Sequence, residues 1–303
     1  MNKVVAVVVT YNRLEMLKKC IVALQKQKHS CDILIIDNAS TDNTEKYAKE
    51  LEVTYCNIYY RNTGGNLGGA GGFNLGVRLA VEAGYEYIWV MDDDCLPKKN
   101  ALDELINADR ILNGQYGWLS SVVLWSDGNE CLMNKQKYIS SKNIFSKYGL
   151  QQAMQATFVS LMLKSKTIVK YGLPIKDFFI WGDDIEYTRR IAVRNKDDCY
   201  VVGNSKVLHV MQENTGSNIA YDNISRLGRY RYAYRNEYYL YKKEGVKGIC
   251  YYFSKCIFNL LRIIFCANTF KYDRIVILVE GIFMGLTFNP KIEFLEERGI
   301  GGK

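Results

Sequence analysis

Apolar and polar residues alternate in blocks along the first 125 residues, and the blocks have the lengths of strands and helices. Continuous β-branched runs over 4–9 and 33–36 are typical of strands buried on both faces of a parallel sheet. The same pattern predicts strands at 57–60, 87–91 and 118–125, with helices over 13–27, 42–52, 100–112 and a segment ending near 83. Strands that alternate with helices predict an α/β fold with a parallel, right-handed, doubly wound sheet.

Two polar residues are placed to start the first helices. Asn12 is a candidate cap for the helix over 13–27, and Asp42 with Glu45 forms a pattern like a capping box. Beyond residue 125 the pattern is weaker. Residues 126–156 show no regular period, 158–163 predicts a strand, 185–195 a helix, 199–202 and 206–210 short strands, and the chain from 224 onward is helical.

Polar clusters follow the predicted strands at their carboxyl ends. In doubly wound sheets, ligands bind beside the carboxyl ends of the strands. Four clusters therefore converge on one edge of the predicted sheet: the Thr10–Asn12 segment, Asp37 with Asn38, a glycine-rich turn, and the run Asp92, Asp93, Asp94. This convergence is the strongest functional signal in the chain.

The three consecutive aspartates repel one another unless a cation compensates them. Hard divalent cations prefer carboxylate oxygens, so the run predicts a Mn²⁺ or Mg²⁺ site. Because side chains alternate along a strand, Asp92 and Asp94 are expected on one face and Asp93 on the other. The alternative is an acidic helix start, with Pro97 opening the following helix.

The turn over 62–73 has six glycines in nine positions and precedes a helix. Glycine permits positive φ and close backbone approach to a ligand, and a helix N-terminus favours phosphate. A flexible surface loop is the structural alternative. Nearby, Asp37 could accept the imide N–H of uracil or thymine, or make an Asx turn. Arg61 could pair with a phosphate or the base, or lie free in solvent.

A second acidic cluster lies in the segment 181–187. A sugar transfer with inversion needs a carboxylate to take a proton from the acceptor hydroxyl, and Asp183 and Asp184 are candidates, with Asp184 preferred. The alternative is helix capping by acids in a first turn. Glu186 is interpreted as an acceptor-binding or structural residue. His209, in an apolar strand, is either a core residue or a third metal ligand; His29 has no predicted role.

Composition excludes several classes and marks out the C-terminal region. The nine cysteines form no Cys-x-x-Cys pair and there are two histidines, which argues against zinc and favours reduced thiols. No secretion signal is predicted, and no segment is read as a membrane span; the best candidate is 275–288. Residues 226–274 carry eleven Lys and Arg against three acids. We therefore predict domains over 1–225 and 226–303, the second contacting an anionic membrane.

Taken together, the motifs resemble glycosyltransferase family 2, an inverting family with the GT-A fold. The resemblance runs from about residue 3 to 240 and is carried by segments 8–13, 36–42, 62–73, 91–94 and 181–187 with His209. The glycine turn is most similar to the galactofuranosyltransferase-like branch and also to some rhamnosyltransferases. A departure from the family pattern is Gly182, which separates Trp181 from the two aspartates.

The resemblance implies roles for individual residues. A metal would be held by Asp92, Asp94 and His209, and Asp93 would contact the sugar or ribose. Asp184 would be the base. The nucleotide-sugar would be contacted by Thr10, Tyr11, Asp37, Arg61, Asn66, Gly68 and Gly69.

The predicted function is a metal-dependent transfer of galactofuranose from UDP-galactofuranose onto a glycan or lipid-linked glycan, with dTDP-rhamnose as the alternative donor. The enzyme would be cytoplasmic and bound peripherally to the inner face of the cell membrane. No nucleic-acid partner is predicted, although the basic C-terminal composition would also suit one; a homo-oligomer interface is a further alternative. A sugar nucleotidyltransferase, whose glycine loop follows the first strand, or a non-catalytic nucleotide-sugar-binding protein are the competing classes.

Overall fold

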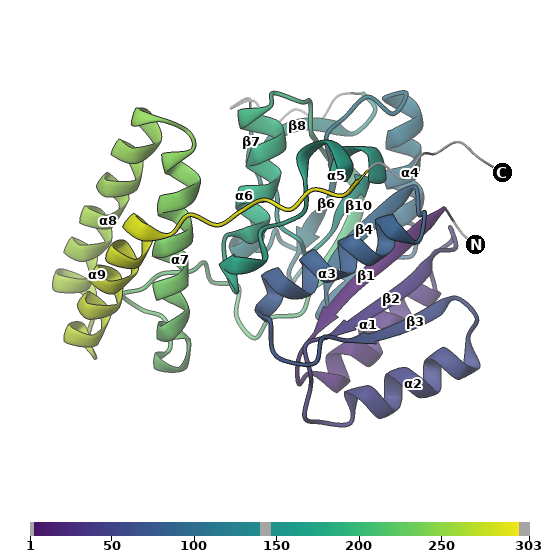
Figure 1. Cartoon of the computed structure of the whole chain (residues 1–303), viewed down its shortest axis with the longest axis horizontal. Coiled ribbons are helices and arrows are strands. Elements are labelled where there is room, and N and C mark those ends of the chain that lie inside the picture. The colour runs from purple at the N-terminus through teal and green to yellow at the C-terminus, as the bar shows by residue number, and fades with distance from the viewer. Residues whose placement is uncertain (1–2, 140–146, 297–303) are drawn as a thin grey trace.

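The computed structural model describes residues 3–139 and 147–296, as an α/β part followed by a helical part (Figure 1). The strands are β1 Val4–Thr10, β2 Asp32–Asp37, β3 Ile58–Asn62, β4 Tyr87–Asp92, β5 Cys95–Pro97, β6 Leu119–Leu124, β7 Lys137–Tyr138, β8 Leu150–Gln155, β9 Leu161–Lys164 and β10 Tyr200–His209. The helices are α1 Leu14–Gln25, α2 Thr44–Thr54, α3 Gly68–Glu82, α4 Ala101–Ile111, α5 Ser165–Tyr171, α6 Asp183–Arg189, α7 Ile224–Lys242, α8 Val246–Cys266 and α9 Lys271–Thr287, with short turns η1 Leu132–Asn134, η2 Lys176–Phe178 and η3 Arg190–Arg194.

The strands form one mixed sheet in the order β3-β2-β1-β4-β9-β6-β10-β8-β7, with β5 beside β10. The first four strands are parallel, as predicted. Farther along, β9 runs antiparallel between β4 and β6, and β10 is parallel to β6 but antiparallel to β8. The α/β fold is confirmed, and the antiparallel strands belong to the half where the sequence pattern weakens.

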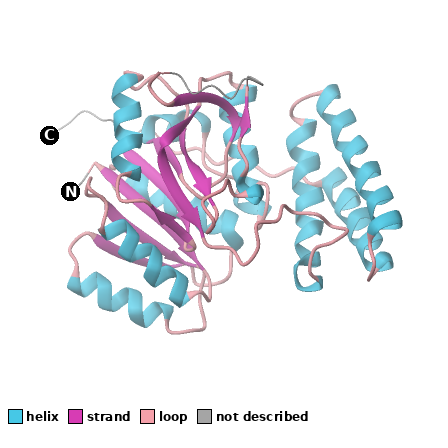
Figure 2. Ribbon diagram, turned by 180° about the vertical axis from the view of Figure 1, so that it is seen from behind, coloured by secondary structure: helices cyan, strands magenta, loops and turns pink. Residues whose placement is uncertain are grey.

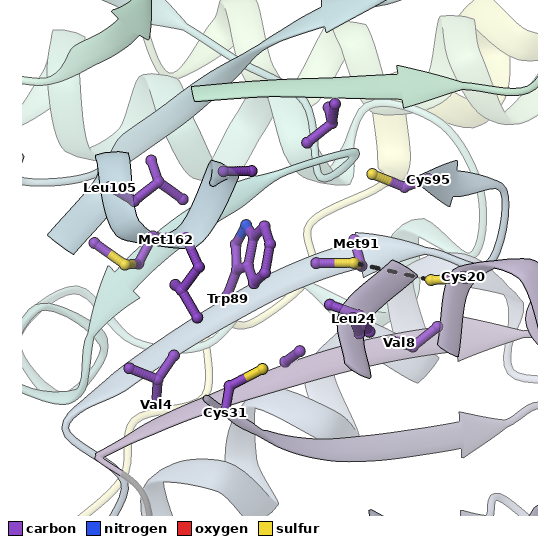
Figure 3. Close-up of a cluster of buried hydrophobic side chains, with 14 of the residues drawn as sticks. Val4, Val8, Cys20, Leu24, Cys31, Trp89, Met91, Cys95, Leu105 and Met162 are labelled. Carbon is purple, nitrogen blue, oxygen red and sulfur yellow. Dashed lines mark hydrogen bonds between the residues drawn. The ribbon is translucent and has the colours of Figure 1, made fainter. Parts of the chain in front are cut away.

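Both faces of the sheet are covered, which explains why β1 is apolar at nearly every position. Its even residues, such as Val4 and Val8, belong to the same apolar cluster as Cys20 and Leu24 of α1 (Figure 3). Its odd residues pack on the other face against α3. Burying an aliphatic side chain of this size contributes about 1.5–3 kcal/mol. A parallel strand between two helical layers therefore needs a continuous β-branched run rather than an alternating one.

The glycine-rich segment serves packing more than turning. Helix α3 begins at Gly68, so most of these glycines are helical, and within the run only Gly64 and Gly68 have positive φ. A Cβ on Gly72 would lie 2.6 Å from Val9 Cγ1, and one on Gly76 would lie 2.4 Å from Val7 Cγ1. The turn is therefore shorter than the predicted span 62–73, because α3 already begins at Gly68. Much of the glycine run lets α3 approach β1 closely.

Several predicted element boundaries are corrected by tertiary contacts. Asn12 has a positive φ of 53° and accepts a hydrogen bond from the Thr41 backbone N–H at 2.6 Å, so it does not cap α1. Asp42 accepts from the Thr44 N–H at 3.0 Å, while Glu45 pairs with Lys49 instead of closing a capping box. The two short strands predicted over 199–210 are one strand, β10, with an irregular register between Val202 and Lys206.

The structure also answers the predictions for residues 126–156 and for the segment that follows the three aspartates. The region 126–156 contains η1, β7 and β8, with 140–146 lying outside the described residues. The segment after the aspartates is the short strand β5, which ends at Pro97, and α4 starts only at Ala101. Pro97 therefore does not open a helix, and the aspartates do not serve as an acidic helix start.

The chain from Ile224 onward is helical, as predicted, and forms a bundle of α7, α8 and α9 with its own apolar core (Figure 2). The segment after α9 then crosses back over the α/β part (Figure 1). There the Glu293 carboxylate pairs with Arg78 at 2.9 Å and Lys176 at 2.7 Å. Its backbone carbonyl accepts from Leu173 N–H. The predicted division at residue 225 lies next to the start of α7 at Ile224, but Glu293 lies against the α/β part.

Candidate active site

The carboxyl ends of the parallel strands meet at one edge, as the topology requires. Thr10 of β1 pairs in register with Asp37 of β2, which pairs with Asn62 of β3. On the other side of β1, Val9 is in register with Asp92 of β4. Polar residues from four strands therefore stand in one row. The predicted convergence of the Thr10, Asp37 and Asp92 clusters is confirmed.

Arg13 forms ion pairs with two of the three aspartates. Its Nη1 lies 3.2 Å from Asp93 Oδ1 and 2.8 Å from Asp94 Oδ2. Thr10 Oγ1 donates to Asp93 Oδ2 at 2.8 Å. The strand ends at Asp92, so Asp93 and Asp94 lie in a turn where strand alternation no longer holds. The expectation that Asp93 points away from Asp94 is therefore wrong.

His209 completes a contact with Asp94 from the end of β10. Its Nε2 lies 3.1 Å from Asp94 Oδ1, and its Nδ1 lies 2.7 Å from Asn134 Oδ1. An amide oxygen only accepts, so Nδ1–H donates to Asn134, and the imidazolium form presents its Nε2–H to the Asp94 carboxylate. Burial opposes the imidazolium, but the contact with Asp94 and the nearby charges raise the pKa of His209 to about 10. Those same partners, with Arg13, lower the pKa of Asp94 despite its burial.

The acidic clusters around Asp92 and Asp184 lie close enough to influence each other. Burial, then the charges of Asp94 and other neighbours including Asp184, raise the pKa of Asp92 to about 8. Burial raises the pKa of Asp93 to about 7, against the opposing effect of Arg13. Burial and the Asp184 charge raise the pKa of Asp183 well above its usual range. Burial raises the pKa of Asp184 to about 6, against hydrogen bonds from backbone N–H groups.

This difference distinguishes the two candidate bases, which the sequence could not do. Burial and the neighbouring carboxylate favour the neutral form of Asp183, whereas backbone N–H groups favour the ionised form of Asp184. Asp184 Oδ1 accepts from the Ile185 N–H at 2.7 Å, which orients the carboxylate. The first turn of α6 also contains Glu186, which is fully buried and paired with Arg190 and Arg194. Glu186 is therefore placed as a structural residue rather than at the acceptor side.

The loop over 177–182 presents these aspartates in a strained conformation. Phe179 and Trp181 have φ of 63° and 61°, and Gly182 has φ of 89°. Left-handed backbone costs about 1–3 kcal/mol at bulky residues and almost nothing at glycine. Gly182, the departure from the family pattern, is thus the residue that turns the chain into α6. Asn236 of α7 holds the loop by donating to the carbonyls of Phe178, Ile180 and Trp181.

The residues predicted to contact the nucleotide form a second part of the candidate site. Asp37 is fully buried; its Oδ1 accepts from the Ser40 N–H and its Oδ2 from the Tyr60 hydroxyl, both at 2.9 Å. Arg61 lies on edge strand β3 with its Nη1 3.6 Å from Glu52, on the side of α2. Asn66 Oδ1 accepts from the Gly68 N–H at 2.9 Å, so it shapes the turn.

Gly68 and Gly69, both predicted to contact phosphate, have different surroundings. Gly68 has φ of 70°, and a Cβ there would lie 2.0 Å from the Phe179 carbonyl oxygen. The same oxygen accepts from the Ala70 N–H at 3.1 Å, so the 177–182 loop caps the start of α3. Gly69 has open space, and Tyr11 is 40% exposed. Of these three, Gly69 and Tyr11 are the accessible ones.

The residues fit a shared cation site. No group of three His, Cys, Asp or Glu side chains in 3–139 and 147–296 encloses a cation alone. However, Asp94 Oδ1 and His209 Nε2 are both buried and face each other at 3.1 Å. Two ligands about 2.1 Å from an octahedral ion are about 3.0 Å apart, and Mg²⁺ often takes one or two protein ligands plus phosphate oxygens. The arrangement suits a cation completed by a diphosphate.

Two important residues were missed at the sequence level. Arg13 stands in the Thr-Tyr-Asn-Arg run, three positions after Thr10, and its charge beside an acidic cluster was a usable signal. Asn134, which fixes the His209 ring, comes from a stretch without regular pattern, and no local signal marks it.

Comparison with known proteins decides the family. Residues 5–112 match the model of glycosyl transferase family 2. The match, which covers less than half of the 303 residues, places this segment in glycosyltransferase family 2. Galactofuranosyltransferase GlfT1 of Mycolicibacterium smegmatis is 26% identical to it over 201 residues, which is 62% of this chain and 65% of GlfT1. The alignment thus spans less than two thirds of that relative.

Solved structures show the fold of this family 2 chain. TarS of S. aureus, residues 1–349 in complex with UDP, superposes with a TM-score of 0.55 at 14% identity, covering 95% of this chain and 72% of TarS. GalNAc-T7 with UDP, GalNAc and Mn²⁺ gives a TM-score of 0.58 at 13% identity, covering 76% of this chain and 48% of GalNAc-T7. The predicted GT-A fold is confirmed.

The raised pKa values predict that the metal-free protein loses stability as pH rises. Asp92, Asp93 and His209 keep protons in the folded state at pH values where the unfolded chain has lost them. The unfolded pKa values are about 3.9 for Asp and 6.5 for His, and the folded values reach about 8 for Asp92 and about 10 for His209, so the loss runs from about pH 4 to about pH 10 and covers the interval from pH 5.5 to 9. In EDTA we expect a Tm about 3–6 °C lower at pH 9 than at pH 5.5.

Saturating Mn²⁺ should raise Tm more at pH 9 than at pH 5.5, because it replaces the protons of the site. Differential scanning fluorimetry measures both. Asp127→Asn, which changes an exposed acid, is the control and should follow the wild type. A Tm in EDTA that rises across this range would contradict the assignment.

Proposed function

We propose that this protein transfers a sugar from a nucleotide-sugar to a hydroxyl of a glycan or lipid-linked glycan, with inversion and with Mn²⁺ or Mg²⁺. The observation that carries the proposal is the meeting of the Asp92–Asp94 turn with an ionised Asp184 at the strand edge of a family 2 fold. The donor we favour is UDP-galactofuranose, supported by the similarity to GlfT1. The alternative donor is dTDP-rhamnose.

Asp184 would act as general base on the acceptor. Its carboxylate takes the proton of the acceptor hydroxyl while that oxygen attacks the anomeric carbon. The attack comes from the face opposite the nucleotide, and the bond from that carbon to the diphosphate oxygen breaks. Asp183, protonated and buried beside it, lowers the local negative charge without competing for the proton. Holding both reactants in line supplies much of the acceleration.

The leaving diphosphate would be met by Asp92, Asp94 and His209 together with their cation. The bound metal would neutralise charge that develops on the departing oxygen. Arg13 keeps Asp93 and Asp94 side by side. Asp93 would face the sugar or ribose, since Thr10 and Arg13 both orient it.

The nucleotide would lie along the strand edge beside Asp37. Each Asp37 oxygen has a second lone pair after its contact with Ser40 or Tyr60, which suits the imide N–H of uracil. We also place Thr10, Tyr11, Arg61, Asn66, Gly68 and Gly69 around this ligand. Gly69, in the first turn of α3, has open space beside its Cα, and we propose it as the position that a phosphate approaches.

We further propose that the enzyme works in the cytoplasm at the inner face of the cell membrane. The described residues contain one helix, α8, long and apolar enough by length and composition to cross a membrane. This differs from the sequence prediction, which placed the best apolar segment at 275–288. A lipid-linked acceptor would be reached directly from such a surface.

The donor assignment is tested by binding. Purified protein with Mn²⁺ is titrated calorimetrically with UDP-galactofuranose, dTDP-rhamnose, UDP and dTDP. We expect saturable binding of UDP-galactofuranose, with Asp37→Ala weakening uridine ligands by about tenfold, the equivalent of one hydrogen bond to a charged group. An Asp127→Asn control should bind as the wild type does. Binding of dTDP-rhamnose alone would move the assignment to the rhamnosyltransferase branch, and binding of neither would remove the proposal.

A further inference from the structure

Helix α8 exposes an apolar face that is unusually wide for a surface helix. Its 21 residues have a mean hydropathy of 1.5 in the most apolar window, yet 17% of that window is buried. At 100° per residue, its exposed large apolar residues share one side of the helix, opposite the side packed on α7. They are Tyr251, Phe253, Ile257, Phe258, Leu261, Ile264 and Phe265.

The neighbouring helix α9 adds to the exposed apolar surface of the bundle. Tyr272, Val279, Phe283 and Leu286 recur at helical spacing and are between 39% and 77% exposed. The opposite side of α9 packs on α7, where Gly281 and Gly285 allow close approach to Tyr234 and Tyr238. Both helices therefore turn their apolar residues away from the bundle core, and α8 lies on the side away from the sheet (Figure 1). We call these exposed residues of α8 and α9 the outer face.

The charges in α8 are all basic. The helix contains Lys247, Lys255 and Arg262 and no acidic residue. Lys255 pairs with Glu237 of α7, whereas Lys247 and Arg262 have no ion-pair partner in the described part of the chain. The Arg262 guanidinium lies over the Phe258 ring, 4.5 Å from its centroid. A basic group on an aromatic stem can keep its charge in water while its stem covers apolar surface.

The predicted role of the basic C-terminal block is thereby changed. Arg231 pairs with Glu280, and Arg235 and Arg274 donate to backbone carbonyls within the fold. Charge alone is therefore a weaker basis for membrane contact than the sequence indicated. The exposed apolar side chains of the outer face would contribute more to membrane binding than the charges do.

Two occupants would cover such a surface, and the charges favour one. A twofold contact between α8 helices of two copies would bring Lys247 and Arg262 together with no acid in α8 to pair with them. Anionic lipid headgroups complement the same charges, and acyl chains accept the aromatic and aliphatic side chains. We propose that the outer face docks on an anionic lipid bilayer, with α8 lying in the plane of the interface.

An interfacial position follows from how α8 is packed. Tyr252, Cys256 and Ile263 are buried against α7 and belong to the core of the bundle. A spanning orientation would pull these side chains out of that core and place Arg262 within the hydrocarbon. An in-plane helix keeps the bundle intact and inserts only its outer side chains, to a depth of about 5–10 Å.

The test uses the full chain and vesicles of defined composition. Wild-type protein is expected to co-sediment with vesicles containing phosphatidylglycerol and to bind phosphatidylcholine vesicles more weakly. The double variant Ile257→Glu with Phe265→Glu, at positions 59% and 78% exposed, should bind at least tenfold more weakly. Val53→Glu, 89% exposed on α2, is the matched control and should bind as the wild type does.

Further measurements separate the alternatives. Carbonate washing of cell membranes should release the protein, and retention in the membrane would overturn the in-plane position. Unchanged vesicle binding by the double variant would refute the outer face as the docking site. A wild-type dimer that the double variant dissociates, without vesicle binding, would assign the face to a second copy. This inference rests on the proposed membrane location. UDP binding is therefore measured on the same proteins, so that the proposal for the active site and the proposal for the outer face are tested separately.

Discussion

Asp184→Asn is expected to lower kcat by about a thousandfold while leaving donor binding within about twofold. General bases of this kind contribute about 10²–10⁴ in rate. The amide has nearly the same shape and can still accept from the Ile185 N–H, so the start of α6 should be preserved. The carboxylate of Asp184 is the ionised member of its pair, with a pKa of about 6. The rate should therefore fall as pH drops through about 6, and the variant should lose this dependence.

Asp183→Asn provides the matched comparison at the adjacent position. Because burial and the Asp184 charge raise the pKa of Asp183 well above its usual range, its neutral form is favoured, and the amide, which is also neutral, should cost less than about tenfold in kcat. Single-turnover assays across pH 5 to 8.5, with UDP affinity by calorimetry, measure both variants. If Asp183→Asn proved the more damaging change, the two roles would be exchanged. A wild-type rate in Asp184→Asn would remove this residue from the mechanism.

Asn236→Leu is expected to lower the free energy of unfolding by about 3 kcal/mol and kcat by about a hundredfold. The side-chain amide lies 3.0 Å from the Phe178 carbonyl, 3.2 Å from that of Ile180 and 2.7 Å from that of Trp181. Leucine has a similar volume and donates nothing. A buried polar group left unsatisfied costs about 1–3 kcal/mol. The strained loop would then lose what holds its left-handed residues in place.

The loss of activity follows from what this loop touches. It leads directly into Asp183 and Asp184, and its Phe179 carbonyl accepts from the first turn of α3. Asn236 is thus a positioning residue, and its substitution should affect kcat more than KM for the donor. Denaturant titration and steady-state kinetics measure the two effects.

Asn223→Ala on the same helix is the control for this prediction. Asn223 caps α7 by accepting from the Ser225 N–H at 3.0 Å, so the change should cost about 1 kcal/mol without altering kcat. Equal kinetic effects of the two substitutions would mean that α7 acts only through global stability. A fully active Asn236→Leu protein would show that the loop keeps its conformation without the clamp.

The sequence by itself determined the parallel half of the sheet and the edge where the site lies. Strands of the β1 and β2 type are recognisable because a parallel strand is apolar on both faces. Their polar ends then coincide because parallel strands all point the same way. For this reason Thr10, Asp37 and Asp92 could be placed at one edge of the sheet without knowledge of any contact between them.

Tertiary structure decided everything that depends on segments distant in the chain. The loop that caps α3 and the amide that clamps it are separated by more than fifty residues, and no local pattern links Phe179 with Asn236. The side-chain directions of Asp93 and Asp94 were set by Arg13 rather than by strand alternation. The difference between Asp183 and Asp184 came from the Asp184 charge beside Asp183 and from the backbone N–H groups that stabilise the Asp184 carboxylate. Hydrophobic periodicity records which side of an element is apolar, but only packing shows whether that side is covered, as α8 demonstrates.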